Sequence, residues 1–260
     1  MTMINFNLLP MRNFSTFFLS LLFCLAFPLT FSGQTLSADN DGDGCVGTPD
    51  LLTLLSQFGE CSSSFTCGDL ISHDGYDYST VLIGDQCWFS ENCRYLPSVS
   101  PSDFNNGSET VPYYYVYDYE GTDVSAAQAT SNYETYGVLY NWPAVMTESI
   151  CPSGWHIPSD GEFTELTDFL GGEDVAGDAL KSTSGWANNG NGSNSSGWIG
   201  VPGGWRSSDG FYYYGLSGVW WSASESGSNS WKRGLNDSNH VFSRYYSGRY
   251  YGFSARCVRD

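Results

Sequence analysis

The longest apolar run of the chain is near its N-terminus. Residues 14–31 carry no charge, Arg12 precedes them, and small polar residues follow. This order is typical of a secretory signal peptide, which we assign to residues 1–33. A run of ~18 apolar residues is also long enough for a membrane anchor. Pro28 near its end and the acidic segment after it favour cleavage, so we expect a mature protein that does not span the membrane.

The next apolar pattern has the period of a helix. Thr48 is suited to the N-cap, Pro49 to the first helical position, and Gly59 to the end of the helix. A short amphipathic helix is therefore predicted, followed by a polar segment, residues 61–66, that we interpret as a linker. The broad apolar face of this helix consists of Leu51, Leu52, Leu54, Leu55 and Phe58.

A second helix is predicted to begin at Ser159. Ser159 and Glu162 have the spacing of a capping box, in which each side chain bonds the backbone N–H of the other residue. Gly171 and Gly172 end the pattern, and a further short helix is expected around residues 175–181. The apolar face of the Ser159 helix is predicted to consist of Phe163, Leu166, Phe169 and Leu170.

The rest of the chain from residue 67 to residue 260 is strand-like. Near its end, apolar and polar residues alternate, which predicts a half-buried strand. Neighbouring aromatic residues in a strand point to opposite faces, so one member of each pair is expected in the core. We assign Trp155, Trp220 and Phe253 to the core. The alternating residues are Phe253, Ala255 and Cys257 on one face and Ser254, Arg256 and Val258 on the other.

Composition and charge narrow the classes of protein. The 260 residues include 41% hydrophobic, 17% aromatic and only 15% charged residues, with 30 glycines. Acidic residues outnumber basic ones by 28 to 10, and the net charge of −18 argues against nucleic-acid binding. The aromatic content argues against disorder, because it supplies apolar surface to bury. A secreted, loop-rich protein fits these values.

Residues 39–50, DNDGDGCVGTPD, have the pattern of a calcium-binding loop. Asp39, Asp41 and Asp43 fall at positions 1, 3 and 5 of a twelve-residue EF-hand loop, with a glycine at position 6. Cys45 would offer its backbone carbonyl at position 7, and Asp50 is at position 12. Carboxylates that converge on one point require a hard cation. The predicted cofactor is Ca²⁺, with Asp39, Asp41, Asp43, Cys45 and Asp50 as its ligands.

Together with its helix, this loop resembles one repeat of a type I dockerin, and we assign residues 34–60 to it. Dockerins carry two such repeats, whereas this sequence shows one. A unit of this size cannot bury its leucines alone. A structural or spacer role is favoured, and docking to an assembly partner is the alternative.

Residues 67–260 resemble the Fibrobacter succinogenes major paralogous domain, a family without an established activity. The resemblance implies an α+β fold that is C-type-lectin-like and related to formylglycine-generating enzymes: loop-rich, with short β-sheets, one or two short helices and disulfides. It rests on CGDLISHDGYDYSTVLIGDQCWFSENCRY (67–95), YGVLYNWPAVM (136–146), CPSGWHIPSDGEFTELTDFLGG (151–172), WIGVPGGWRSSDGFYY (198–213), GVWWSASES (218–226) and GFSARCVRD (252–260).

The cysteines are expected to form disulfides in an exported protein. We predict that Cys151 before the helix bonds Cys257 in the last strand, joining distant parts of the domain. Cys67, Cys87 and Cys93 are expected to hold one further disulfide, with the pairing left open. The odd number left after removal of Cys24 leaves one cysteine unpaired or bonded to another molecule.

The sequence does not single out a catalytic centre. The histidines lack metal-ligand spacing, and no GxSxG motif is present. His156 lies between Trp155 and Ile157, which favours a packing role. Cys151 and Cys257 are interpreted as structural rather than as a reactive pair. The EPN and QPD calcium signatures of lectins are absent.

Aromatic residues are the best candidates for ligand contacts, because sugars stack on exposed tryptophan and tyrosine rings. We select Trp205, Tyr212, Trp231 and Tyr246 as surface candidates. Most basic residues lie after residue 205, either as a binding face or as internal partners of the acidic residues, and we favour pairing. The predicted function is a secreted or cell-surface, non-catalytic module that binds glycan or a surface protein. A glycan-active enzyme or accessory, and an assembly protein, are the alternatives.

Overall fold

The computed structural model describes residues 29–31, 34–36, 46–57, 65–104 and 107–260. The chain divides into two compact units, residues 1–64 and 65–260.

In the first unit, β1 (Leu29–Phe31) pairs with β2 (Gln34–Leu36), and α1 spans Thr48–Gln57. Thr48 is the first helical residue rather than the N-cap. Asp50 is buried, and its carboxylate accepts a hydrogen bond of 2.8 Å from the backbone N–H of Gly47. This contact closes the first turn of the helix, as in one half of a capping box.

Several predictions for this unit fall outside the described residues. They include Asp39, Asp41, Asp43 and Cys45 of the calcium loop and nearly all of the predicted signal peptide. Among the described residues, no helix is long and apolar enough to cross a bilayer.

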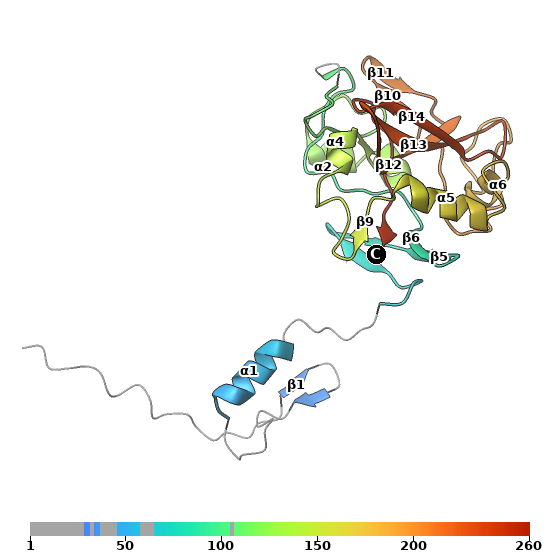
Figure 1. Cartoon of the computed structure of the whole chain (residues 1–260). Helices are drawn as coiled ribbons and strands as arrows, with labels where there is room; N and C mark the ends of the chain where they lie inside the picture. Colours follow the sequence, from blue (N-terminus) through green and yellow to red (C-terminus); the bar gives the residue numbers. More distant parts are fainter. Residues whose placement is uncertain (1–28, 32–33, 37–45, 58–64, 105–106) are drawn as a thin grey trace, which may run out of the picture. The chain divides into compact units, whose positions relative to one another are not determined.

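The second unit is built from short antiparallel sheets (Figure 1). One sheet, in the order β5-β6-β15-β9, joins strands from both ends of the unit. Strand β15 pairs with β6 and β9, with Val258 opposite Trp88 and His156. The strands are β3 (Ile71–His73) and β4 (Tyr76–Tyr78), which pair with each other, β5 (Thr80–Ile83), β6 (Gln86–Phe89), β9 (Trp155–His156) and β15 (Val258–Arg259).

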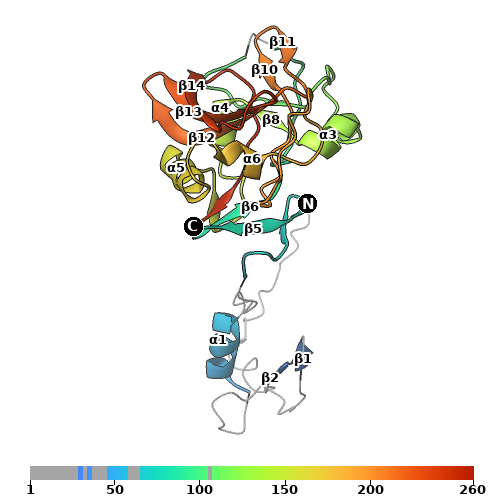
Figure 2. The same cartoon turned by 90° about the vertical axis from the view of Figure 1, so that its right-hand side faces the viewer.

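The longest strands form a second sheet, in the order β12-β13-β14. A separate hairpin, β10-β11, lies at the end of the unit opposite to β5 and β6 (Figures 1 and 2). The strands are β7 (Tyr114–Tyr115) and β8 (Leu139–Tyr140), which pair with each other, β10 (Trp205–Ser207), β11 (Gly210–Tyr212), β12 (Ser217–Ser226), β13 (Asn229–Asn236) and β14 (Ser243–Gly248).

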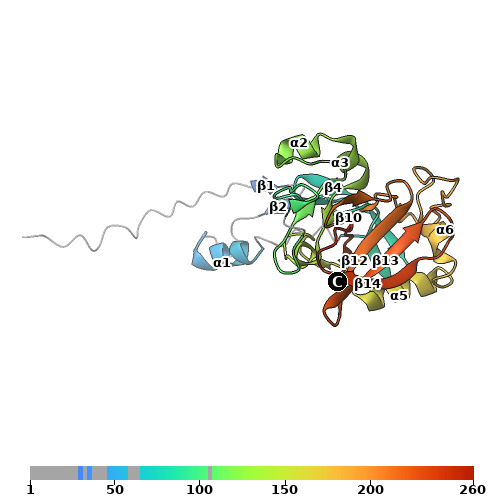
Figure 3. The same cartoon turned by 90° about the horizontal axis from the view of Figure 1, so that it is seen from above.

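Helix α5 (Asp160–Phe169) confirms the predicted capping box. Ser159 and Glu162 exchange side-chain-to-backbone hydrogen bonds. Phe163 and Leu166 are fully buried and Leu170 packs against the same cluster, but Phe169 is 64% exposed, which corrects its placement on the packing face. Helix α6 (Ala176–Leu180) is the second predicted helix, and both helices flank the β12-β13-β14 sheet (Figure 3).

Among the described residues of the second unit, three further helices are present beyond the one or two that the sequence predicts. They are α2 (Val124–Gln128), α3 (Ser131–Tyr136) and α4 (Trp142–Val145). Asp123, Thr130 and Asn141 act as their N-caps, each accepting a bond from a backbone N–H in the first turn. Caps of this kind satisfy donors that a short helix leaves free.

The core contains Trp155, Trp220 and Phe253, as predicted. The expected alternation of buried and exposed neighbours fails nearby, because Trp221 is as deeply buried as Trp220. The same holds for residues 253–258, all of which are buried, and only Val258 and Arg259 of this segment form a strand. This segment bridges β8 through Phe253 and β12 through Ser254, so the protein covers it on both sides.

The structure joins Cys151 to Cys257, as predicted, and Cys67 to Cys87. Cys93 is the third member of the set whose pairing the sequence left open, and it is a buried free thiol. Cys45 and Cys61 lie outside the described residues. The Cys67–Cys87 bond joins residues 20 positions apart in the sequence, whereas the Cys151–Cys257 bond joins residues 106 positions apart.

Candidate ligand-binding surface

The β10-β11 hairpin is fixed to the unit by Arg206. This side chain is fully buried and donates hydrogen bonds to the carbonyl oxygens of Ser102 (2.6 Å) and Tyr250 (3.0 Å). Its guanidinium also lies over the ring of Tyr115, and its backbone pairs with Gly252. Adjacent strand residues point to opposite faces, so anchoring Arg206 directs Trp205 to the other face of the hairpin.

A glycine permits the tight base of the hairpin. Gly204 has a φ of 66°, a conformation that other residues rarely adopt. A Cβ atom at this position would lie 2.4 Å from the carbonyl oxygen of Tyr212. The sequence PGGW before the hairpin therefore allows the backbone at Gly204 to approach β11 closely.

Trp205 forms the centre of an aromatic cluster on this hairpin. It faces Tyr212 across the two strands, with ring centroids 5.2 Å apart. The ring of Tyr213 stacks on Trp205 at 5.5 Å with an interplanar angle of 16°. Tyr213 and Tyr214 are 55% and 49% exposed, and Tyr212 is 36% exposed. We call Trp205, Tyr212, Tyr213 and Tyr214 the aromatic platform.

Tyr213 has an unusual backbone conformation. Its φ of 60° lies in the left-handed region, which is rare for a bulky side chain and costs about 1–2 kcal/mol. The protein therefore holds this tyrosine against an intrinsic preference and leaves its ring half exposed. Such outliers gather at binding and active sites.

The platform also carries polar groups. The Tyr212 hydroxyl donates a hydrogen bond of 3.0 Å to Asp209, and this bond raises the pKa of the tyrosine. The carboxylate retains further lone pairs that can accept hydrogen bonds. A ring-shaped ligand that stacks on the aromatic faces would thus meet hydrogen-bonding groups at its edge.

Trp231 and Tyr246, the other two predicted ligand residues, form a separate pair. They face each other across β13 and β14, with ring centroids 5.8 Å apart and nearly perpendicular planes. The Arg244 guanidinium lies 3.7 Å from the ring centroid of Trp231 and covers one of its faces. Tyr246 is 59% exposed. Arg244 thus occupies a surface on which a sugar would otherwise stack.

The two pairs lie on opposite faces of the β12-β13-β14 sheet. Lys232 follows Trp231 in β13 and so points to the other face. Its ammonium lies over Phe253, whose ring stacks on Tyr251, and Tyr251 contacts Trp205. This sequence of contacts places the platform on the Lys232 face. The four predicted residues therefore form two sites rather than one.

Of the seven basic residues after residue 205, three pair with carboxylates: Arg233, Arg244 and Arg249. The other four contact backbone carbonyls, an amide or aromatic rings, so the favoured pairing with acidic residues is confirmed only in part. Arg233 is fully buried and pairs with Asp160 at 3.0 Å and with Glu173. Arg244 pairs with Asp160 at 2.7 Å. Arg256 lies 3.7 Å over the ring of Trp198 and bonds Asn92 Oδ1 at 2.8 Å.

His156 has a polar role rather than the predicted packing role. One ring nitrogen is bonded to Glu162 at 2.7 Å and the other to Asp260. Partial burial lowers its pKa, but the hydrogen bonds to Asp260 and Glu162 outweigh this effect, so the net pKa is raised. His156 thereby links the last residue of the sequence to the capping box of α5.

Within the described residues, no group of three or more histidine, cysteine or acidic side chains is placed to hold a metal ion. The predicted calcium loop lies mainly outside these residues, and Asp50 is its described member. Sequence reasoning missed Tyr213 and Tyr214. The run Tyr212-Tyr213-Tyr214 was a usable signal, but strict alternation of faces favoured one tyrosine over its neighbours.

Comparison with known families assigns the larger unit. The model of the Fibrobacter succinogenes major domain matches residues 81–259, which is more than half of the chain. The protein belongs to this family, as the resemblance of residues 67–260 implies. No match was found among curated proteins or among solved structures.

Proposed function

We propose that this protein is a secreted or cell-surface, non-catalytic module that binds carbohydrate through the aromatic platform. The observation that carries the proposal is the stack of Tyr213 on Trp205, held in a strained conformation at the surface. Exposed aromatic groups of this size mark interaction surfaces. Pyranose rings present apolar C–H faces that match such rings, and Asp209 offers an acceptor for their hydroxyl groups.

The fold and compartment form part of the same proposal. The unit is C-type-lectin-like, which is supported by the sheet that joins β5, β6, β9 and β15 and by the Cys151–Cys257 disulfide between distant segments. Two disulfides in the described residues and the apolar N-terminal segment support export. Because the EPN and QPD motifs are absent, the sugar is bound by stacking and without calcium.

Calcium belongs to the N-terminal unit in this proposal. Asp39, Asp41, Asp43, the carbonyl of Cys45 and Asp50 would bind Ca²⁺, a hard cation that prefers oxygen ligands. One carboxylate oxygen of Asp50 accepts a hydrogen bond from the backbone N–H of Gly47, next to the predicted loop position. The bound ion would neutralise the negative charge of the carboxylates.

The test is calorimetric titration of the purified protein with soluble polysaccharides of different backbone, with calcium and with a chelator. We expect at least one polysaccharide to bind in both conditions. Tyr213→Ala should weaken this binding at least about tenfold, or 1.4 kcal/mol. The matched control is Tyr246→Ala, which removes an equally exposed tyrosine from the opposite face and should leave the affinity unchanged.

Other results would redirect the assignment. An equal loss of polysaccharide affinity in Tyr213→Ala and Tyr246→Ala would show that the aromatic platform is not the binding site. Shortening of the polysaccharide during the titration would establish a glycan-active enzyme. Absence of glycan binding, with calcium-dependent capture of a second protein by residues 34–60, would favour the assembly protein.

A further inference from the structure

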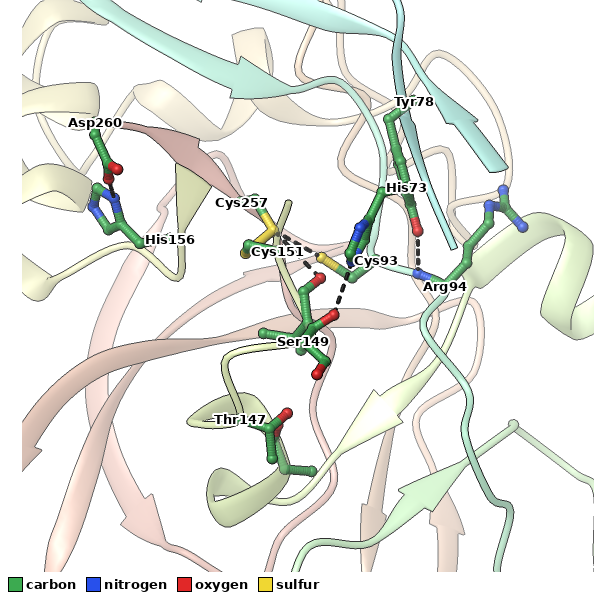
Figure 4. Close-up of a disulfide and its surroundings, with 12 residues drawn as sticks. His73, Tyr78, Cys93, Arg94, Thr147, Ser149, Cys151, His156, Cys257 and Asp260 are labelled. Atoms are coloured by element: carbon green, nitrogen blue, oxygen red, sulfur yellow. Dashed lines mark hydrogen bonds and ion pairs between the residues drawn. A yellow bond between two sulfur atoms is a disulfide. The ribbon is translucent and has the colours of Figure 1, made fainter. Parts of the chain in front are cut away.

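Three cysteines meet at one point of the larger unit. The Sγ atom of Cys93 lies 3.5 Å from the Sγ atom of Cys257, which is bonded to Cys151 (Figure 4). Cys93 and Cys257 are fully buried, and the backbone N–H of Cys93 is fixed by a 2.9 Å hydrogen bond to Ala255. The free thiol is thus in van der Waals contact with the disulfide, and motion of ~1.5 Å would bring the two sulfurs to bonding distance.

The other sulfur of this disulfide belongs to the wall of a groove. Cys151 lines an open groove of about 550 Å³, and Cys93 and Cys257 do not. Val145, Met146 and Trp155 form apolar parts of the wall, and Met146 is 46% exposed. Cys151 is itself buried but keeps 7% of its surface accessible, whereas Cys93 and Cys257 keep none, so a small molecule in this groove would reach Cys151 before the other two cysteines.

From this arrangement we propose that Cys93, Cys257 and Cys151 form a thiol–disulfide relay that exposes Cys151 as a reactive thiol toward an external disulfide. The Cys93 thiolate attacks Cys257 Sγ. A Cys93–Cys257 bond forms, the Cys151–Cys257 bond breaks, and Cys151 leaves as a thiolate. The Cys151 thiolate then attacks an external disulfide, forms a mixed disulfide with one half, and releases the other half as a thiolate. No further oxidant or reductant is required.

The relay has an intrinsic control on its rate. Burial raises the pKa of the Cys93 thiol to about 12, partly offset by the charge of Arg256. The thiolate, which is the nucleophile, is therefore a small fraction at neutral pH, and this fraction rises about tenfold per pH unit. The native pairing persists at neutral pH, and Cys151 is released slowly. This inference does not depend on the proposed carbohydrate binding.

The test uses oxidised glutathione as the external disulfide and non-reducing peptide mapping as the readout. Wild-type protein should gain one glutathione on Cys151 together with a Cys93–Cys257 cross-link. The rate should rise about tenfold per pH unit between about pH 7 and pH 9. Cys93→Ala should abolish both products while the Cys151–Cys257 and Cys67–Cys87 bonds remain.

Two results would overturn the relay. The first is glutathione on Cys93 with the Cys151–Cys257 bond intact. The second is glutathione on Cys151 at equal rates in wild type and Cys93→Ala. A second variant keeps the test decisive if Cys93→Ala does not fold. Cys93→Ser, which keeps the size of the side chain but cannot form a disulfide, should likewise gain no glutathione on Cys151, and a gain at the wild-type rate also contradicts the proposal.

Discussion

The aromatic residues of this protein serve different ends in its interior and on its β10-β11 hairpin. In the interior, Trp198 and Trp220 pack on each other and enclose the guanidinium of Arg256. At the hairpin, Tyr213 stacks on the partly buried Trp205 and is itself 55% exposed, and the anchoring Arg206 points to the opposite face of β10 from Trp205. The interior rings are covered by packing and cation–π contacts, whereas the three tyrosines of the platform are 36–55% exposed.

In both regions a buried arginine donates hydrogen bonds to backbone carbonyl oxygens. Arg256 donates to Ser90 O at 3.2 Å and also to Trp198 O, both inside the core. Burial lowers its pKa, and these acceptors together with the ring faces compensate the charge. Arg206 does the same for Ser102 and Tyr250 beneath the hairpin. Buried arginines thus hold loops together in a unit with few long strands, and the exposed rings of the platform are those that we propose for glycan binding.

The largest effect is expected for Arg256→Leu. This change leaves the carbonyl oxygens of Ser90 and Trp198 without their donor in the core. We expect a loss of about 3–5 kcal/mol in the free energy of unfolding, measured by urea denaturation. The control is Arg259→Leu at an exposed position, which should cost less than about 1 kcal/mol. Equal losses would show that Arg256 does not organise the interior.

A smaller effect with an unusual sign is expected for Tyr213→Gly. Glycine relieves the strain of a positive φ, so the free energy of unfolding should stay unchanged or rise by up to about 1 kcal/mol. Glycan binding should be lost at the same time, because the ring that stacks on Trp205 is gone. A marked loss of stability would mean that Tyr213 is a packing residue, and the contrast between interior and platform would disappear.

The smallest effect is expected at His156, which lies in neither aromatic cluster. Its pKa is raised above 6.5 in the folded protein, so its stabilisation is present below pH 6.5 and is lost as the pH rises through the folded value. His156→Asn should cost less than about 1 kcal/mol at about pH 5 and close to nothing at about pH 8, by thermal unfolding.

The control for this pH dependence is His240→Asn. His240 is exposed, and its ring nitrogen is 3.6 Å from Asp178, farther than the Glu162 contact of His156. His240→Asn should change the free energy of unfolding less than His156→Asn does at about pH 5. If the difference in stability between wild type and His156→Asn became larger toward alkaline pH, this would contradict the hydrogen-bonded pairing of His156 with Glu162 and Asp260.

Local signals predicted part of this fold. The capping box at Ser159 and Glu162 specified α5 because both residues act within one turn. The disulfide between Cys151 and Cys257 was also predicted. Helices α2, α3 and α4 were missed because segments of 4 to 6 residues are too short to display a hydrophobic period.

The platform was only half predicted, for a physical reason. Alternation along a strand distinguishes two faces, but it does not say whether each face is covered. Trp221 and Arg256 are buried because the protein packs on both sides of their segments, whereas Tyr245 and Tyr246 are both exposed on β14. Tyr213 was missed because its positive φ breaks the alternation, and no residue type in the sequence announces that conformation.

The most direct test of the central claim is to map the bound sugar on the protein by NMR. The isotope-labelled protein would be titrated with the best-binding oligosaccharide from the calorimetric series. We expect the largest shift changes at the Trp205 indole and the backbone amides of residues 212–214, with little change at Trp231 and Tyr246. Shift changes centred on Trp231 and Tyr246, or on the groove beside Cys151, would contradict it.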